Sequence, residues 1–210
     1  MSPRPQRILV VSDDDVCAAP LVAAVLRSEL ADREVEVAVT SAGTEAELGR
    51  YACELAVSRM PDREASDADR SIPINADLIR RADLVVVMDR EQRAHVNRLA
   101  PGRQHTVFTL REAVSLAGGG RAETWRTEET VAGFAEALHR RRGLTRPRRL
   151  PLPRRGLLRR RVAAIDVDDL LEAHRLDAGA HVWALGQTRS AAKRLGESLR
   201  ARLAAQRSAA

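Results

Sequence analysis

The stretch Ile8-Leu-Val-Val-Ser-Asp-Asp-Asp-Val-Cys-Ala-Ala-Pro20 decides the fold of this chain. Its apolar run, Ile8–Val11, is too short for a helix and rich in β-branched residues, which predicts a buried strand. A short polar turn follows, and Pro20 stands near the start of an expected helix, where its fixed φ is favourable. A strand, a tight loop and a helix N-terminus form the arrangement in which backbone N–H groups converge on an anion. Here, however, the loop itself carries three carboxylates.

Length and composition set the limits of the interpretation. A chain of 210 residues can build one good core but is too short for two ordinary enzyme domains. It contains no apolar run near the roughly 20 residues that span a bilayer and no signal-peptide core, so we expect a cytoplasmic protein. Its two cysteines, Cys17 and Cys53, have neither a disulfide framework nor a zinc-ligand spacing, so we expect no metal and no cofactor. An aromatic content of 2% argues against a stacking platform for single strands or sugars.

Positive charge is concentrated in one segment. Eleven arginines and no acidic residue lie between His139 and Arg161, so within a formal net charge of +6 the rest of the chain carries −5. The Pro and Gly residues of this segment predict a flexible insertion. Arg140–Arg161 could bind nucleic acid, an anionic membrane surface or the acidic body of the protein. The alternative is a solvated linker in a chain that uses arginine almost to the exclusion of lysine.

Strand and helix patterns alternate along the chain. Strands are expected at Ile8–Val11, Val35–Val39, Ala82–Asp89 and Thr106–Phe108, and helices at Ala19–Leu30, Glu45–Val57, Ile74–Arg81, Glu91–Leu99, Glu128–Arg142 and Leu170 to about Gln206. This order predicts a single three-layer α/β domain, in which helices flank a four-stranded parallel sheet. We expect residues 1–142 to form the body, 143–161 an Arg/Pro-rich insertion, and 162–210 a segment and helix that complete the same domain. Any site should lie at the carboxyl ends of the strands.

Several stretches resemble the low-molecular-weight protein tyrosine phosphatases. The loop of that family reads Val-Cys-x-Gly-Asn-x-Cys-Arg-Ser-Pro, and residues 11–20 follow its frame. Ser41-Ala-Gly-Thr44 and Ala82–Met88 resemble two further stretches of the family, and Phe108–Glu112 resembles one of its actinobacterial members. The resemblance implies the same α/β fold and a phosphotyrosine-binding loop after the first strand.

The same alignment shows that the working residues of the loop are changed. By this resemblance Ser12 stands where the family has its nucleophilic cysteine, and Ala18 stands where it has its phosphate-binding arginine. Asp169, in Asp166-Val-Asp-Asp169, stands at the position of the general acid. The remaining loop positions are Asp13, Asp14, Asp15, Val16, Cys17 and Ala19, where Asp14-Asp15 replaces Gly-Asn.

These changes predict a catalytically impaired protein. Phosphotyrosine hydrolysis of this kind needs a stabilised thiolate and positive charge around the phosphoryl oxygens. A serine hydroxyl without a neighbouring base is a far weaker nucleophile. Each carboxylate about 4 Å from a phosphate would cost roughly 4 kcal/mol at an effective dielectric of about 20. We therefore expect a pseudophosphatase that binds a protein or phosphoprotein, in bacterial tyrosine-phosphorylation or polysaccharide-related regulation as the resemblance suggests.

An active phosphohydrolase is the alternative. Residual family chemistry is one form of it. The other is an aspartate-nucleophile enzyme of haloacid-dehalogenase type, in which Asp13 would attack, Asp15 would act as acid and base, and both would bind magnesium. The only lysine, Lys193, lies in the terminal helix and not before the last acidic motif, where that chemistry needs a cation.

The last part of the chain has a structural interpretation as well. Asp169-Leu-Leu-Glu172 matches a capping box that would begin the terminal helix. His174 and His181 would then lie two turns apart on one helix face, which indicates packing or solvent contact more than metal binding. Both cysteines are expected in the core.

Overall fold

The computed structural model describes residues 5–31, 36–62, 70–118, 130–144, 149, 160, 166–172, 174 and 177–203. Four parallel strands form one sheet in the order β2-β1-β3-β4. They are β1 (Gln6–Ser12), β2 (Val37–Gly43), β3 (Leu84–Val87) and β4 (Val107–Thr109). In the register, Val10 of β1 stands between Ser41 of β2 and Val86 of β3. The expected four-stranded parallel α/β domain is therefore confirmed.

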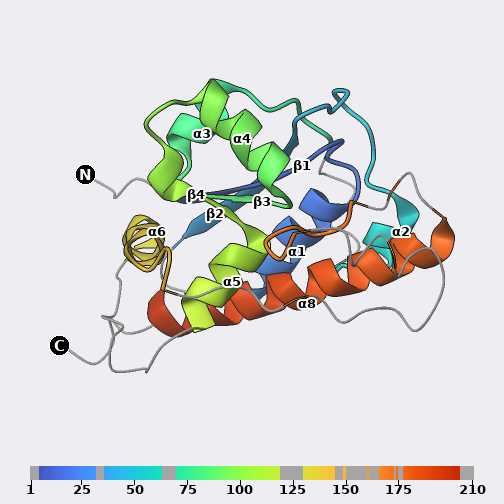
Figure 1. Ribbon diagram of the computed structural model, residues 1–210. Helices are drawn as coiled ribbons and strands as arrows, with labels where there is room; N and C mark the ends of the chain where they lie inside the picture. The colour runs from blue at the N-terminus through green and yellow to red at the C-terminus, as the bar shows by residue number, and fades with distance from the viewer. Residues whose placement is uncertain are drawn as a thin grey trace.

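Helices cover both faces of this sheet (Figure 1). They are α1 (Ala18–Leu30), α2 (Glu54–Val57), α3 (Ala76–Arg81), α4 (Arg90–Leu99), α5 (Leu110–Gly118), α6 (Val131–Arg140) and α8 (Ala178–Leu203), with a 3-10 turn, η2, at Gln104–Thr106. Helices α3 and α4 lie on one side of the sheet, and α1, α5 and α8 lie on the other (Figure 1). No helix in the described part of the chain is both long and apolar enough to cross a membrane.

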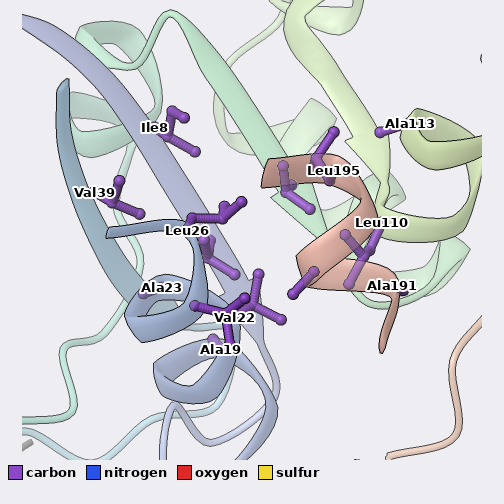
Figure 2. Packing of buried hydrophobic residues seen from close by; sticks show 14 of the residues in the cluster. Ile8, Ala19, Val22, Ala23, Leu26, Val39, Leu110, Ala113, Ala191 and Leu195 are labelled. Atoms are coloured by element: carbon purple, nitrogen blue, oxygen red, sulfur yellow. The ribbon is translucent and has the colours of Figure 1, made fainter. Parts of the chain in front are cut away.

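Strand β1 is buried on both faces, as its continuous apolar run predicts. Ile8 and Val10 belong to the large core with α1, α5, α6 and α8, whereas Leu9 and Val11 belong to a smaller core with α3 and α4. Figure 2 shows Ile8 beside side chains of α1, with Leu195 of α8 in the same cluster. Strand β1 leads into the loop at residues 13–17, called the acidic loop below, and is held rigidly from both sides.

The terminal helix packs directly on α1. Leu195 and Leu199 of α8 are completely buried in the large core, as are Val22 and Leu26 of α1. At Gly196 an added Cβ would lie 2.7 Å from the Cβ of Glu29, so the two helices approach closely there. Helix α8 therefore completes the core that α1 and the sheet begin.

The bounds expected for the second strand and the second helix are wrong. Strand β2 continues to Gly43, four residues beyond its expected end at Val39. The helix expected at Glu45–Val57 exists only as α2, because the backbone before it pairs with Ser71. Gly49 donates its N–H to Ser71 O, and Arg50 O accepts the N–H of Ser71. Gly49 has a φ of 86°, which a helix does not allow.

The terminal helix begins at Ala178 and not at Leu170. Asp177 caps it, since its Oδ1 accepts the N–H of Ala180 at 2.9 Å. The capping box expected at Asp169–Glu172 is therefore wrong. Helix α5 follows β4 directly and was not expected.

The helix expected at Glu128–Arg142 is present as α6, with one apolar face. Val131, Phe134, Ala135 and Leu138 of α6 are completely buried. Of the predicted basic insertion at 143–161, all but residues 143, 144, 149 and 160 lie outside the described residues.

Candidate functional site

The acidic loop lies between β1 and α1 and is held against the end of β2. Ser12 O accepts the N–H of Thr44 at 3.0 Å, and Asp13 O accepts the N–H of Glu45 at 2.8 Å. A Cβ at Gly43 would lie only 2.5 Å from Asp13 O. The Ser-Ala-Gly-Thr stretch is therefore required for this close approach, because only glycine leaves room for the loop backbone.

Two carboxylates of the loop are buried inside it. Asp14 is 5% exposed and Asp15 is 1% exposed. Asp14 Oδ1 accepts the N–H of Val16 at 3.2 Å, and Asp15 Oδ2 accepts the N–H of Ile72 at 2.9 Å. Asp15 has a φ of 52°, a left-handed conformation that aspartate and asparagine tolerate better than most residues. The carboxylate of Asp14 thus binds the N–H of Val16, which would otherwise be available to an external anion.

Ser12 and Ala18 are also buried. Ser12 has no exposed surface, and its Oγ has no hydrogen-bond partner among the described residues. Ala18 is the first residue of α1 and presents only a methyl group. Among the described residues, the hydroxyl therefore has no base as a hydrogen-bond partner, and position 18 supplies no guanidinium.

Gln92 of α4 connects the loop to a later segment. Its Nε2 donates to Asp13 Oδ1 at 2.9 Å and to Glu172 Oε1 at 3.1 Å, while its Oε1 accepts the N–H of Met88 at 2.8 Å. Burial raises the pKa of Glu172 to about 8, and the negative charge of Asp13 contributes to the same shift. Sequence reasoning missed both as site residues, because Gln92 lies in no recognisable motif and Glu172 was interpreted only as part of a capping box.

Asp169, at the expected general-acid position, is bound to the start of α4. Its Oδ1 accepts the backbone N–H of Arg90 at 3.0 Å and lies 3.4 Å from Arg90 Nε. The neighbouring Leu170 donates its N–H to Met88 O at 2.9 Å, just beyond β3. The structure thus brings Asp169 to the carboxyl edge of the sheet, with an arginine as its partner.

A second cluster lies at the N-terminus of α1. Cys17 Sγ lies 2.9 Å from His174 Nδ1 and 3.4 Å from His181 Nε2. Cys53 Sγ lies 3.8 Å from the same His181 nitrogen. One ligand atom from each of these four side chains lies within 4.8 Å of all the others.

Sequence reasoning did not anticipate this Cys–His cluster (Cys17, Cys53, His174 and His181). His174 precedes α8 and does not lie on it, so the two histidines do not share a helix face as expected. Their rings meet edge to face, with centroids 5.3 Å apart. The four residues belong to four separate segments of the chain, so no local spacing predicts their contact.

The two thiols of the cluster differ in acidity. A hydrogen bond between them raises the pKa of Cys17, and burial adds to that shift. The same hydrogen bond lowers the pKa of Cys53 to about 6, against the opposing effect of burial. The N–H of Ala56 and the two imidazoles also favour the Cys53 thiolate.

Comparison with known proteins gives consistent matches. The family model described as low molecular weight phosphotyrosine protein phosphatase matches residues 7–125. The probable low-molecular-weight protein-tyrosine-phosphatase EpsP of Ralstonia nicotianae is 34% identical over 106 residues, which is 50% of this chain and 70% of that protein.

Solved structures share the fold at low sequence identity. The tyrosine phosphatase Wzb from Escherichia coli K30, in complex with sulphate, has a TM-score of 0.56 and 16% identity over 93% of this chain and 99% of its own. The YwlE arginine phosphatase from Geobacillus stearothermophilus has a TM-score of 0.59 and 20% identity over 94% of each chain.

Proposed function

Because this chain belongs to the low-molecular-weight protein tyrosine phosphatase family, we propose that it is a member that binds a protein partner and does not hydrolyse phosphotyrosine. The observation that carries this proposal is the buried Asp14 carboxylate, whose Oδ1 accepts the N–H of Val16 inside the loop. A phosphate group would have to displace a negative charge that the protein itself supplies.

The missing nucleophile supports the same conclusion. A hydroxyl reacts with phosphorus only when a base removes its proton or its pKa is lowered. Ser12 Oγ is buried, and the described part of the chain gives it no hydrogen-bond partner. With Ala18 in place of a cation, the charge that develops on the phosphoryl oxygens is not neutralised either.

The charge around the loop supports it further. Asp13 accepts from Gln92 at the mouth of the loop, and Asp14 and Asp15 lie within it. At an effective dielectric of about 20, each carboxylate about 4 Å from a phosphate costs roughly 4 kcal/mol. The cost of two such contacts exceeds the binding free energy of a weak phosphate ligand, because a Kd of about 1 mM corresponds to only about 4 kcal/mol.

The aspartate-nucleophile alternative has less support. Its two proposed working residues have structural partners, since Asp13 Oδ1 accepts from Gln92 and Asp15 Oδ2 accepts from the backbone of Ile72. Family membership also removes the fold-level basis of that interpretation.

A protein partner in bacterial tyrosine phosphorylation, including the control of polysaccharide production, is the first to search for.

The test is a p-nitrophenyl phosphate assay on the full chain, with EDTA and with added magnesium. We expect no turnover above that of Ser12→Ala under either condition. Turnover in EDTA would contradict the proposal. Magnesium-dependent turnover that Asp13→Asn removes and Ser12→Ala retains would contradict it as well, in favour of the aspartate route.

A restored loop provides the positive control. The combined variant Ser12→Cys, Asp14→Gly, Asp15→Asn and Ala18→Arg returns the thiol, the cation and the open amides of the family loop. We expect it to bind inorganic phosphate by calorimetric titration at least tenfold more tightly than the native chain, which we expect not to bind measurably. Equal phosphate binding by the two proteins would show that the acidic loop does not exclude phosphate.

A further inference from the structure

We propose that Cys17, Cys53, His174 and His181 bind one zinc ion. Two thiolates and two imidazoles form the ligand set of the commonest structural zinc sites. Each of the four side chains here offers one such atom, and all four atoms gather within 4.8 Å. This inference is independent of the proposed function, because none of the four residues is required there.

The distances fit tetrahedral coordination. With Zn–S about 2.3 Å and Zn–N about 2.0–2.1 Å, neighbouring sulfur and nitrogen ligands of a tetrahedron lie about 3.6 Å apart. Three of the four sulfur–nitrogen distances in the cluster are 2.9, 3.4 and 3.8 Å, and the fourth, between Cys53 and His174, is within 4.8 Å. They bracket the required value, so small side-chain rotations are enough to admit the ion.

The surroundings of the cluster are those of a metal site. His174 presents Nδ1 to Cys17 and Nε2 to Asp14, whose Oδ2 lies 3.9 Å away. If Nδ1 binds the ion, the proton must be on Nε2, which is the nitrogen that faces the Asp14 carboxylate, and carboxylates commonly stand on that side of metal-bound histidines. Cys53 Sγ accepts the N–H of Ala56 at 3.3 Å, which stabilises a thiolate.

Backbone contacts hold the ligands in place before any ion arrives. Cys17 is 2% exposed and occupies the N-cap position of α1, at the end of the acidic loop. Cys53 caps α2, and its N–H donates to Val16 O at 2.7 Å, beside Cys17. His181 lies in the first turn of α8, which Asp177 caps. A bound ion would therefore tie the start of α8 and the segment before it to the acidic loop and to α2.

The site differs from a zinc finger because its ligands lie far apart in the sequence. Cys17 and His174 are 157 positions apart, and Cys17 and His181 are 164 positions apart. An ion that joins such distant segments closes long loops, and it stabilises only the folded chain, because an unfolded chain seldom brings the four ligands together.

The experiment measures zinc binding by the reduced full-length chain, in competition with a chromophoric chelator. We expect one zinc ion per chain. Substitution by cobalt should give the visible bands of a tetrahedral complex together with a thiolate charge-transfer band. A reduced native chain that binds no zinc, or a cobalt complex without thiolate bands, would overturn the proposal without any variant being made.

Matched variants assign the ligands. Cys53→Ser and His181→Gln should each weaken zinc binding by at least 100-fold, whereas His95→Gln, on α4 and outside the cluster, should leave it unchanged. Asp14→Asn keeps the oxygen that accepts from Val16 and should weaken binding about 10–100-fold, the range for second-shell partners. Circular dichroism checks that each variant is folded. Native affinity in both folded ligand variants would assign the zinc to other residues and overturn the site.

Discussion

Single residues govern how closely strand β2 approaches the acidic loop. At Gly43 an added Cβ would meet Asp13 O at 2.5 Å and Asp15 N at 2.9 Å, both of them backbone atoms that cannot rotate away. The glycine therefore sets the position of the loop, although it carries no functional group.

Gly43→Ala is expected to lower the free energy of unfolding by about 1–3 kcal/mol, the usual cost of forcing an extra carbon into a packed site. Denaturant titration measures it. Gly118→Ala, where nothing lies within 4 Å of the added carbon, is the matched control and should change stability by less than about 0.5 kcal/mol. Equal midpoints for native protein and Gly43→Ala would mean that the loop can retreat from β2.

Asp89 links the stability of the protein to pH. It caps α4, where its Oδ1 accepts the N–H of Gln92 at 2.8 Å. Burial raises its pKa above 3.8, against that hydrogen bond, and the charges of Asp13 and Asp169 add to the shift. The folded state therefore keeps the Asp89 proton to a higher pH than the unfolded state does, so this residue lowers stability as the pH rises from 3.8 through its raised value.

Asp89→Asn keeps an oxygen that can cap α4 and removes the charge. We expect it to raise the free energy of unfolding at neutral pH and to flatten the fall in stability above pH 3.8, measured by denaturant titration across a pH series. Glu47→Gln removes an exposed carboxylate and is the control. A loss of stability in Asp89→Asn at neutral pH would show that the charge of Asp89 is favourable to the helix.

At the level of elements, two glycines of α8 have opposite surroundings, and only one of them lies at the contact with α1. Gly196 faces Glu29, whose Cβ would lie 2.7 Å from an added methyl group, whereas Gly186 in the same helix has nothing within 4 Å. The same substitution at these two positions separates helix propensity from interhelical packing.

Gly186→Ala is expected to stabilise the protein by up to about 1 kcal/mol, because alanine favours a helix more than glycine does. Gly196→Ala has the same local gain but should lower stability by about 1–2 kcal/mol, because the clash with Glu29 exceeds it. Thermal unfolding of the two variants in parallel measures the difference. The same sign for both would mean that α8 can shift away from α1 without loss.

For the whole molecule, the two cores on opposite sides of the sheet do not carry equal weight. The larger one includes Leu185, Leu195, Leu199 and Leu203 of α8, all 4% exposed or less. Burial of each leucine contributes about 1.5–3 kcal/mol, so four of them contribute about 6–12 kcal/mol. That sum is comparable to the whole stability of a typical domain, about 5–15 kcal/mol.

Deletion of residues 177–210 is therefore expected to abolish cooperative unfolding, measured by circular dichroism during heating. Leu48→Ala, at a leucine that is 76% exposed, should leave the melting temperature within a few degrees of the native value and serves as the control. A cooperative transition in the truncated chain would show that residues 5–144 can form a stable core without α8.

The layered fold could be predicted from the amino-acid sequence alone. Runs such as Ile8–Val11 and the apolar face of α6 are local patterns, and local patterns report which side chains must be buried. The prediction that Ser12 and Ala18 replace the family's cysteine and arginine came from the resemblance, which could be followed there because the loop is continuous in sequence. The likeness of Phe108–Glu112 to actinobacterial relatives stays a prediction.

Three features depend on how the elements pack and could not be predicted. They are the start of α8, the hydrogen bonds by which Gln92 joins Asp13 to Glu172, and the contact of two cysteines with two histidines. The residues Asp169–Glu172 match the local pattern of a capping box, but no helix begins there. Instead, Leu170 donates a backbone hydrogen bond to Met88. Side chains from segments more than 150 positions apart meet only after the sheet and helices have packed. No spacing along the chain records such a meeting, since it is the arrangement of the elements in space that creates it.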